Sequence, residues 1–142
     1  MIKIRLTQTV FPMDIISSYY YAFNNGDLAK FASLLDDNII HDINQGKRVV
    51  GKREFLDFMY HMNSCYKESV NDLVVMYSKD GSRAATEFTI HGTYLKTDSG
   101  LPEAKGQEYT LPVGAFFEIY QDRIIRVTNY YNLNDWLIQI EG

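Results

Sequence analysis

The sequence predicts an α+β domain in which helices come first and antiparallel strands follow. Apolar residues recur at helical spacing from about residue 12 to 35 and again from 55 to 66. From residue 70 onward the chain instead contains long strand-like segments, with a hairpin signal at Asp80-Gly81. A long, curved sheet wrapped around helices leaves a concave face, so we expect a pocket there.

The N-terminal third is expected to hold two consecutive helices and then two short strands. Pro12 suits the start of the first helix, and Asn25-Gly26 ends it. Asp27 can cap the second helix, which runs to about Leu35. The short strands are predicted over residues 38–44 and up to Gly51, with a turn at 45–47 between them.

A third helix is indicated by apolar residues at offsets of 3, 4, 7 and 11 positions, namely Phe55, Phe58, Met59, Met62 and Tyr66. Four long strands are then expected, over residues 70–78, 82–96, 107–120 and 123–133. A loop at 97–106 and a tight turn near Gln121-Asp122 separate the later strands. Residues 134–140 fit either a short terminal helix or a further strand.

Composition predicts a single domain over residues 1–142, because this length and a hydrophobic content of 46% allow a real core without metal or disulfide staples. Eleven Tyr and eight Phe suit a cavity or an interface, where an apolar ring and a polar hydroxyl are both useful. Fourteen scattered basic residues against eighteen acidic ones give a net charge of −4, which argues against nucleic-acid binding.

Several kinds of site are not expected from the sequence. The lone Cys65 excludes an internal disulfide framework and a multi-cysteine zinc site. The histidines at 41, 61 and 91 show no His-x-x-x-His spacing, so no metal site is expected. No Gly-rich phosphate loop or nucleophile elbow is present, and we therefore expect no cofactor.

A cytoplasmic protein without membrane contact is expected. No apolar stretch approaches the ~18–20 residues that span a bilayer. The first residues, MIKIRLTQTVFP, lack a long apolar segment and a small-residue cleavage site, so a secretory signal is not predicted.

The order of motifs resembles the nuclear transport factor 2-like superfamily, and within it the branch of ketosteroid isomerase-related and SnoaL-like polyketide cyclase proteins. The resemblance covers about residues 12–138 and rests on Asn-Gly-Asp after the first helix, Asp-Asp-x-Ile-Ile-His-Asp before Gly51, and a final strand Arg-Ile-Ile-Arg-Val-Thr-Asn-Tyr-Tyr. It implies a cone-shaped, strongly curved sheet closed by three helices, with a ligand cavity at one end. It also implies a homodimer that pairs through the outer face of the sheet. Fold alone does not fix the reaction.

Two catalytic residues follow from that resemblance. In ketosteroid isomerases a Tyr eight residues before the Asp of Gly-Asp stabilises the oxyanion, and Tyr19 lies eight residues before Asp27. The catalytic base is an Asp nine residues before the Gly that opens the third helix, and Asp42 lies nine residues before Gly51. The alternatives are core packing for Tyr19 and a turn-forming role for Asp42.

The chain also departs from the family pattern. The second oxyanion donor of the isomerases falls near Gly114 or Ala115, whose side chains cannot donate. The oxyanion hole of ketosteroid isomerases, formed by a Tyr and a protonated Asp, is therefore incomplete here. Limonene epoxide hydrolase carries an Asp where this chain has Asn129, so its hydrolytic mechanism is not expected.

Further candidate residues lie on the predicted strands. Glu87 and His91 share one strand face with Thr89; the family register turns this face toward the cavity as a second acid/base pair, whereas alternation alone turns it toward solvent. Asn129 and Tyr131 share a face that can bind a carbonyl or hydroxyl group.

Two residues near Asp42 complete the candidate set. Asn44 lies on the same strand face as Asp42 and either binds a ligand or satisfies the turn. His41 lies on the opposite face, as a structural or a ligand-binding histidine.

Two functions remain open from the sequence. The first is a cofactor-free enzyme of isomerase, cyclase or dehydratase type that acts on a small apolar molecule with a carbonyl group, Asp42 moving the proton and Tyr19 stabilising the enolate. The second is a non-catalytic ligand-binding or dimerisation module that uses the same cavity.

Overall fold

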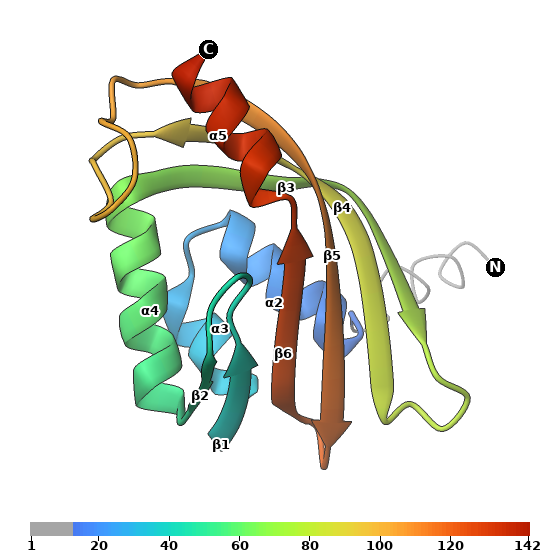
Figure 1. Cartoon of the computed structure of the whole chain (residues 1–142). Helices are drawn as coiled ribbons and strands as arrows, with labels where there is room; N and C mark the ends of the chain where they lie inside the picture. The colour runs from blue at the N-terminus through green and yellow to red at the C-terminus, as the bar shows by residue number, and fades with distance from the viewer. Residues whose placement is uncertain (1–12) are drawn as a thin grey trace, which may run out of the picture.

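The computed structural model describes residues 13–142 as one curved, six-stranded sheet with helices on its concave side (Figure 1). The strand order is β2-β1-β6-β5-β4-β3, and all neighbours are antiparallel except β1 and β6, which run parallel. The α+β prediction and the mixed, cone-like sheet are confirmed.

The helices form where capping residues and apolar spacing predict them. The four helices of the described part are α2 (Ile15–Asn24), α3 (Leu28–Ser33), α4 (Lys52–Cys65) and α5 (Leu133–Glu141). The side chain of Asp14 caps α2 by accepting a hydrogen bond from Ser17 N, and Asp27 caps α3 in the same way through Lys30 N. Pro12, the predicted helix start, lies outside the described residues.

The strands are β1 (Leu35–Asp42), β2 (Arg48–Val50), β3 (Tyr66–Tyr77), β4 (Arg83–Tyr94), β5 (Glu108–Tyr120) and β6 (Arg123–Tyr131). β3 begins four residues earlier than predicted, because Tyr66 is already extended and pairs with Tyr94. The apolar spacing that includes Tyr66 therefore continues one residue past the end of the helix. Residues 133–141 form a helix, which settles the alternative at the C-terminal end.

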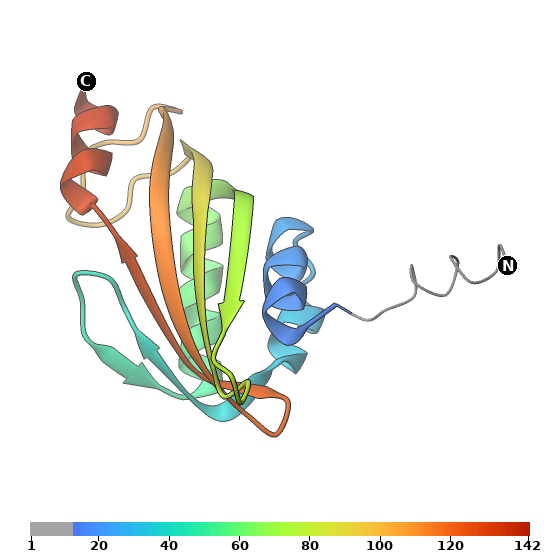
Figure 2. The ribbon, with the colours of Figure 1, turned by 90° about the vertical axis from the view of Figure 1, so that its right-hand side faces the viewer.

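The sheet bends over α2, α3 and α4, as the two perpendicular views show (Figures 1 and 2). Aromatic and aliphatic side chains of these helices meet the inner face of the sheet; the largest fully buried ones include Tyr94, Phe31, Phe55 and Phe117. At the far end, α5 packs against β5. Within residues 13–142, none of the helices has the length and apolar character needed to cross a membrane.

Candidate functional site

A mostly apolar cavity of about 310 Å³ lies between the inner face of the sheet, α2 and α4. Its volume is at the lower end of the range of sites for drug-sized molecules. Apolar walls come from Phe58 and Met62 of α4, Phe88 of β4 and Trp136 of α5. Polar atoms form the smaller part of the surface of the wall, and their positions decide which polar groups of a ligand the cavity can bind.

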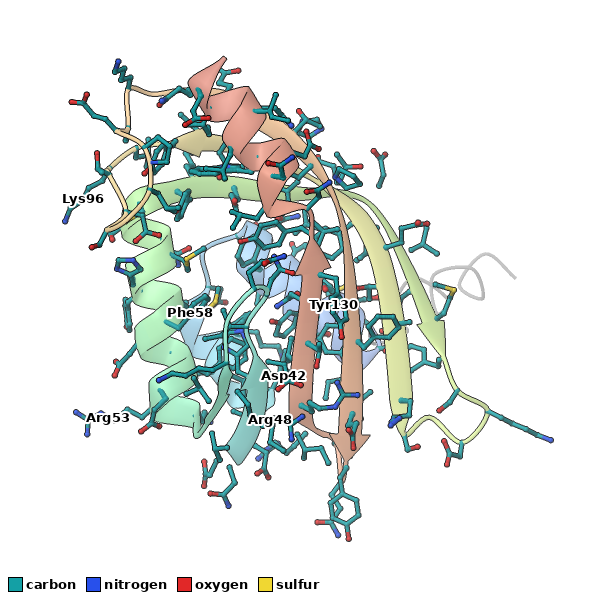
Figure 3. The ribbon with its side chains drawn as sticks, in the orientation of Figure 1. Asp42, Arg48, Arg53, Phe58, Lys96 and Tyr130 are labelled. Atoms are coloured by element: carbon teal, nitrogen blue, oxygen red, sulfur yellow. The ribbon has the colours of Figure 1, made fainter. Side chains whose placement is uncertain are left out.

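Asp42 does not face this cavity, and the prediction that it looks into the pocket is wrong. Its carboxylate forms an ion pair with Arg48, with Nε 2.7 Å from Oδ1, and accepts a hydrogen bond of 2.8 Å from Thr128 Oγ1. Figure 3 labels Asp42 and Arg48 near each other. The hydrogen bond from Arg48 is the main reason that the pKa of Asp42 lies below its ordinary value; burial opposes it and Thr128 adds to it. A carboxylate so stabilised in its charged form is a weak base.

His41 occupies the inward position instead. Successive side chains of a strand point to opposite faces, so a shift of one residue exchanges the cavity for the outer surface. The His41 ring is 3% exposed, lines the cavity and stacks on Phe55, with ring centroids 4.4 Å apart. Burial lowers its pKa to about 4, against the opposing charge of Asp42, so the ring is neutral at pH 7. Its Nδ1 is the one buried side-chain nitrogen or oxygen without a hydrogen-bond partner in residues 13–142.

Glu87 and His91 lie on the outer face of β4, so they do not form an acid/base pair in the cavity. Both are exposed, while Phe88 and Ile90 between them are buried against the helices. His91 Nδ1 lies 3.2 Å from Oγ1 of Thr110 on the neighbouring strand. The simple alternation of polar and apolar residues gives the correct faces here, and the family register does not.

Tyr19 lines the cavity from α2 and is nearly fully buried. Its ring packs against Phe31 and Phe117, at centroid distances of 4.6 and 5.4 Å. Burial raises the pKa of its hydroxyl well above the ordinary value, and Tyr20 adds to this. The phenol therefore stays protonated and can act only as a neutral hydrogen-bonding group.

Asn44, Asn129 and Tyr131 all lie in the cavity wall. The side chain of Asn44 is used by the backbone of Tyr131: Nδ2 donates to its carbonyl at 3.0 Å, and Oδ1 accepts from its N–H at 3.3 Å. Asn44 thus ties the chain after β1 to the end of β6. Burial raises the pKa of the Tyr131 hydroxyl; the hydrogen bond with Asn44 partly offsets this, and the negative charges of Glu68 and Asp98 add to the rise.

Glu68 is a cavity-lining carboxyl group that the sequence reasoning missed. It lies on β3 and accepts a hydrogen bond of 2.6 Å from the hydroxyl of Tyr109 on β5. Burial raises the pKa of Glu68, and the Tyr109 hydrogen bond only partly offsets this. The carboxylate therefore binds a proton more readily than that of an exposed Glu, which suits a group that takes and returns protons.

Glycine at position 92 makes this hydrogen bond possible. Glu68, Gly92 and Tyr109 lie side by side across three neighbouring strands. A Cβ at position 92 would lie 2.3 Å from the ring of Tyr109, so the ring crosses β4 where no side chain is present. Side chains two residues apart on a strand share a face, so Glu68 lies on the same face of β3 as the buried Val70. This placement was missed because the predicted strand begins only at residue 70.

A model of the SnoaL-like domain matches residues 16–127 of the chain. Among solved structures, a candidate polyketide cyclase from Pseudomonas putida KT2440 is 56% identical, with a TM-score of 0.89, and the match covers 91% of this chain and 99% of that one. One from Silicibacter sp. TM1040, also described as a candidate polyketide cyclase, is 46% identical, with a TM-score of 0.88 and coverage of 90% and 93%.

More distant matches extend the likeness of fold. An epoxide hydrolase from M. tuberculosis, similar to limonene epoxide hydrolase, has a TM-score of 0.67 at 16% identity, covering 89% of this chain and 86% of that one, and at this identity only the fold is shared. Among curated proteins, no sequence matches the chain. The family model covers most of the chain and agrees with the curved sheet and its cavity; the chain therefore belongs to the SnoaL-like family.

Proposed function

We propose that this protein binds a small, mostly apolar molecule with a carbonyl group and transfers a proton on it without a cofactor, as an isomerase, cyclase or dehydratase does. The single observation that carries this proposal is Glu68, a carboxyl group in the wall of an apolar cavity whose pKa burial raises. In this proposal Glu68 replaces Asp42 as the group that takes the proton from the carbon next to the carbonyl.

Tyr131 is the group we assign to the developing oxyanion. Its hydroxyl lies in the same cavity and is close enough to Glu68 for the carboxylate charge to raise its pKa. A phenol that stays protonated donates a hydrogen bond to an enolate oxygen, and loss of one such donor typically slows a reaction by ~10²–10³. Asn129 offers a second donor from the same strand.

Tyr109 holds the Glu68 carboxyl group in one orientation through its hydrogen bond of 2.6 Å. The proton that Glu68 takes from the substrate returns from the same carboxyl group to another carbon or oxygen of the intermediate. Isomerisation, aldol-type cyclisation and dehydration share the first of these steps, so the proposal does not depend on which follows.

The test is deuterium exchange at the α-carbon of a panel of apolar ketones, measured by NMR. We expect Glu68→Gln to slow the exchange by ~10²–10⁴, the usual contribution of a general base. Asp42→Asn, on the outer face, is the matched control and is expected to exchange at the wild-type rate. Equal rates for Glu68→Gln and the wild-type protein would overturn the assignment.

Binding of a hydrophobic fluorophore separates the catalytic proposal from a binding module. Saturable binding to the wild-type protein that Glu68→Gln leaves unchanged, together with no exchange of any ketone, would indicate a cavity that binds without catalysis. Binding together with exchange that depends on Glu68 would support the enzyme.

We also propose that two copies pair through the outer face of the sheet. Phe116 and Tyr130 lie there with 46% and 57% of their surface exposed, and their ring centroids are 5.9 Å apart. Figure 3 labels Tyr130 on β6. Exposed aromatic pairs of this kind are enriched in interfaces. Light scattering should give twice the mass of one chain for the wild-type protein and a lower mass for Tyr130→Asp; a monomeric wild-type protein would exclude the pairing.

A further inference from the structure

Three potential metal ligands meet where the last turn of α4 faces the loop after β4. His61 and Cys65 are four residues apart on α4 and therefore lie on the same side of the helix. Asp98 comes from the loop, 33 positions further along the chain than Cys65. One ligand atom of each residue lies within 4.8 Å of those of the other two.

The carboxylate of Asp98 is held by groups on both sides. Its Oδ2 accepts a hydrogen bond of 2.7 Å from the hydroxyl of Tyr66, and its Oδ1 lies 2.8 Å from His61 Nε2. Carboxylates that bind metals are usually oriented by such second hydrogen bonds, which leave one oxygen for the ion. Tyr66 would therefore position Asp98, whose other oxygen already points to His61.

Backbone hydrogen bonds fasten the loop to the end of α4. The carbonyl of Cys65 accepts the N–H of Leu95 at 2.7 Å and that of Lys96 at 3.3 Å. The N–H of Asp98 donates to the hydroxyl of Tyr94 at 3.0 Å. Figure 3 labels Lys96 in this loop, beside the upper end of α4. The three side chains therefore come from a framework that is fixed by other contacts.

The donor set selects one class of ion. A thiolate and an imidazole suit zinc and similar borderline ions, whereas magnesium and calcium prefer oxygen ligands alone. A neutral imidazole, a thiolate and a carboxylate carry two negative charges together, which a divalent cation balances. Three protein ligands leave the fourth tetrahedral position to water.

Access and location agree with this chemistry. The His61 side chain is 54% exposed, so an ion can enter from its side, while Cys65 is buried and excludes bulk water on the other side. Asp98 also lines the cavity. An ion at this place would join α4 to the loop at the rim of the cavity.

We propose that His61, Cys65 and Asp98 bind a zinc-class divalent cation that fastens the loop over residues 95–98 to the end of α4. The site uses none of the residues to which the proton transfer is assigned, and it can be tested with the metal alone.

The test is calorimetric titration of untagged, chelator-treated full-length protein with Zn²⁺. We expect one equivalent to bind to the wild-type protein, and at least tenfold weaker binding to His61→Ala and to Asp98→Asn. Tyr66→Phe, which keeps all three ligands, should weaken binding about tenfold, because a ligand then loses its orienting hydrogen bond. His91→Ala is the matched control: it removes an exposed histidine of the outer face and should bind as the wild type does.

Two further measurements distinguish a loss of metal binding from a loss of folding in the variants. Zinc should raise the melting temperature of the wild-type protein and of His91→Ala but not that of His61→Ala, since an ion that binds only the native state stabilises it. Cobalt should give a thiolate charge-transfer absorption that Cys65→Ser abolishes. The proposal fails if no saturable zinc binding occurs, or if His61→Ala and Asp98→Asn both bind zinc as tightly as the wild-type protein. Neither result depends on whether Glu68 is catalytic.

Discussion

The two faces of the sheet carry the same types of polar residue in opposite settings. On the inner face, burial lowers the pKa of His41 and raises the pKa of Glu68. Burial therefore favours the neutral form of both side chains. On the outer face, the hydrogen bond from Arg48 lowers the pKa of Asp42, which favours the charged carboxylate. His41 and Asp42 are adjacent in sequence, so the face of the sheet, rather than the residue type or the spacing, decides which group can do chemistry.

The largest expected difference between the faces is a pH effect at His41. The unfolded chain binds a proton at this histidine near the ordinary pKa of 6.5, but the native protein only at about 4. Between these values the unfolded state holds more protons, so stability is full above pH 6.5 and falls as the pH is lowered. A difference of this size corresponds to about 3 kcal/mol, at ~1.4 kcal/mol for each pH unit.

The measurement is urea unfolding of the wild-type protein and of His41→Phe between pH 7 and pH 4. The phenyl ring can keep the contact with Phe55 and removes the titrating group. The wild-type protein should lose about 3 kcal/mol relative to the variant over this range, while contributions from Glu68 cancel in the comparison. Parallel curves for His41→Phe and the wild type would contradict the prediction.

A second contrast between the faces concerns two glycines on adjacent strands. Gly92→Ala places a methyl group 2.3 Å from the Tyr109 ring on the inner side, so we expect a loss of about 1–3 kcal/mol from overpacking. Gly114→Ala, where the nearest atom is 3.8 Å away, is the matched control and should be neutral or slightly stabilising. Urea melts of both variants measure this, and adding Tyr109→Ala to Gly92→Ala should remove the clash. Equal stabilities of Gly92→Ala and Gly114→Ala would show that the ring does not need the space.

The smallest expected effect is that of the outer ion pair. The Arg48 side chain is 57% exposed, so Asp42→Asn should cost no more than about 1 kcal/mol at pH 7. The lowered pKa of Asp42 means that its contribution is present at neutral pH and is lost as the pH falls through the acidic range. Urea melts at low and high salt should show the cost shrinking as salt is added. A salt-independent loss of several kcal/mol would indicate a buried, structural carboxylate instead.

Counting along the chain missed a cavity-lining position by one residue. Nine positions before Gly51 leads to Asp42, and the residue that lines the cavity is its neighbour His41. A shift of one residue turns a side chain by about 100° in a helix, but in a strand it points the side chain to the opposite face of the sheet. The alternation of strand faces also explains the wrong placement of Glu87 and His91. The family register turned them toward the cavity, whereas their alternation with the apolar Phe88 and Ile90 predicts that they face solvent.

Glu68 and Asp98 were missed for different reasons. Glu68 falls between the predicted third helix and the strand expected from residue 70, because the apolar spacing that includes Tyr66 hides the point where the helix ends. Asp98 lies in a loop, and no spacing rule relates a loop residue to His61 or Cys65 on a helix. Contacts of the tertiary structure bring them together, among them the backbone hydrogen bonds between Cys65 and the segment 95–96 and the hydrogen bond from Tyr66 to Asp98.

The order of elements and the fold class follow from the sequence, because apolar periodicity and capping residues act over a few neighbouring positions. The family follows from the resemblance in the order of motifs. The tertiary structure decided which polar side chains share a space. Strand register turns His41 inward and Asp42 outward, and the crossing of Tyr109 over Gly92 gives Glu68 its partner. Burial and partner charges depend on distances between residues far apart in the chain, and these distances exist only after the sheet has curved around its helices.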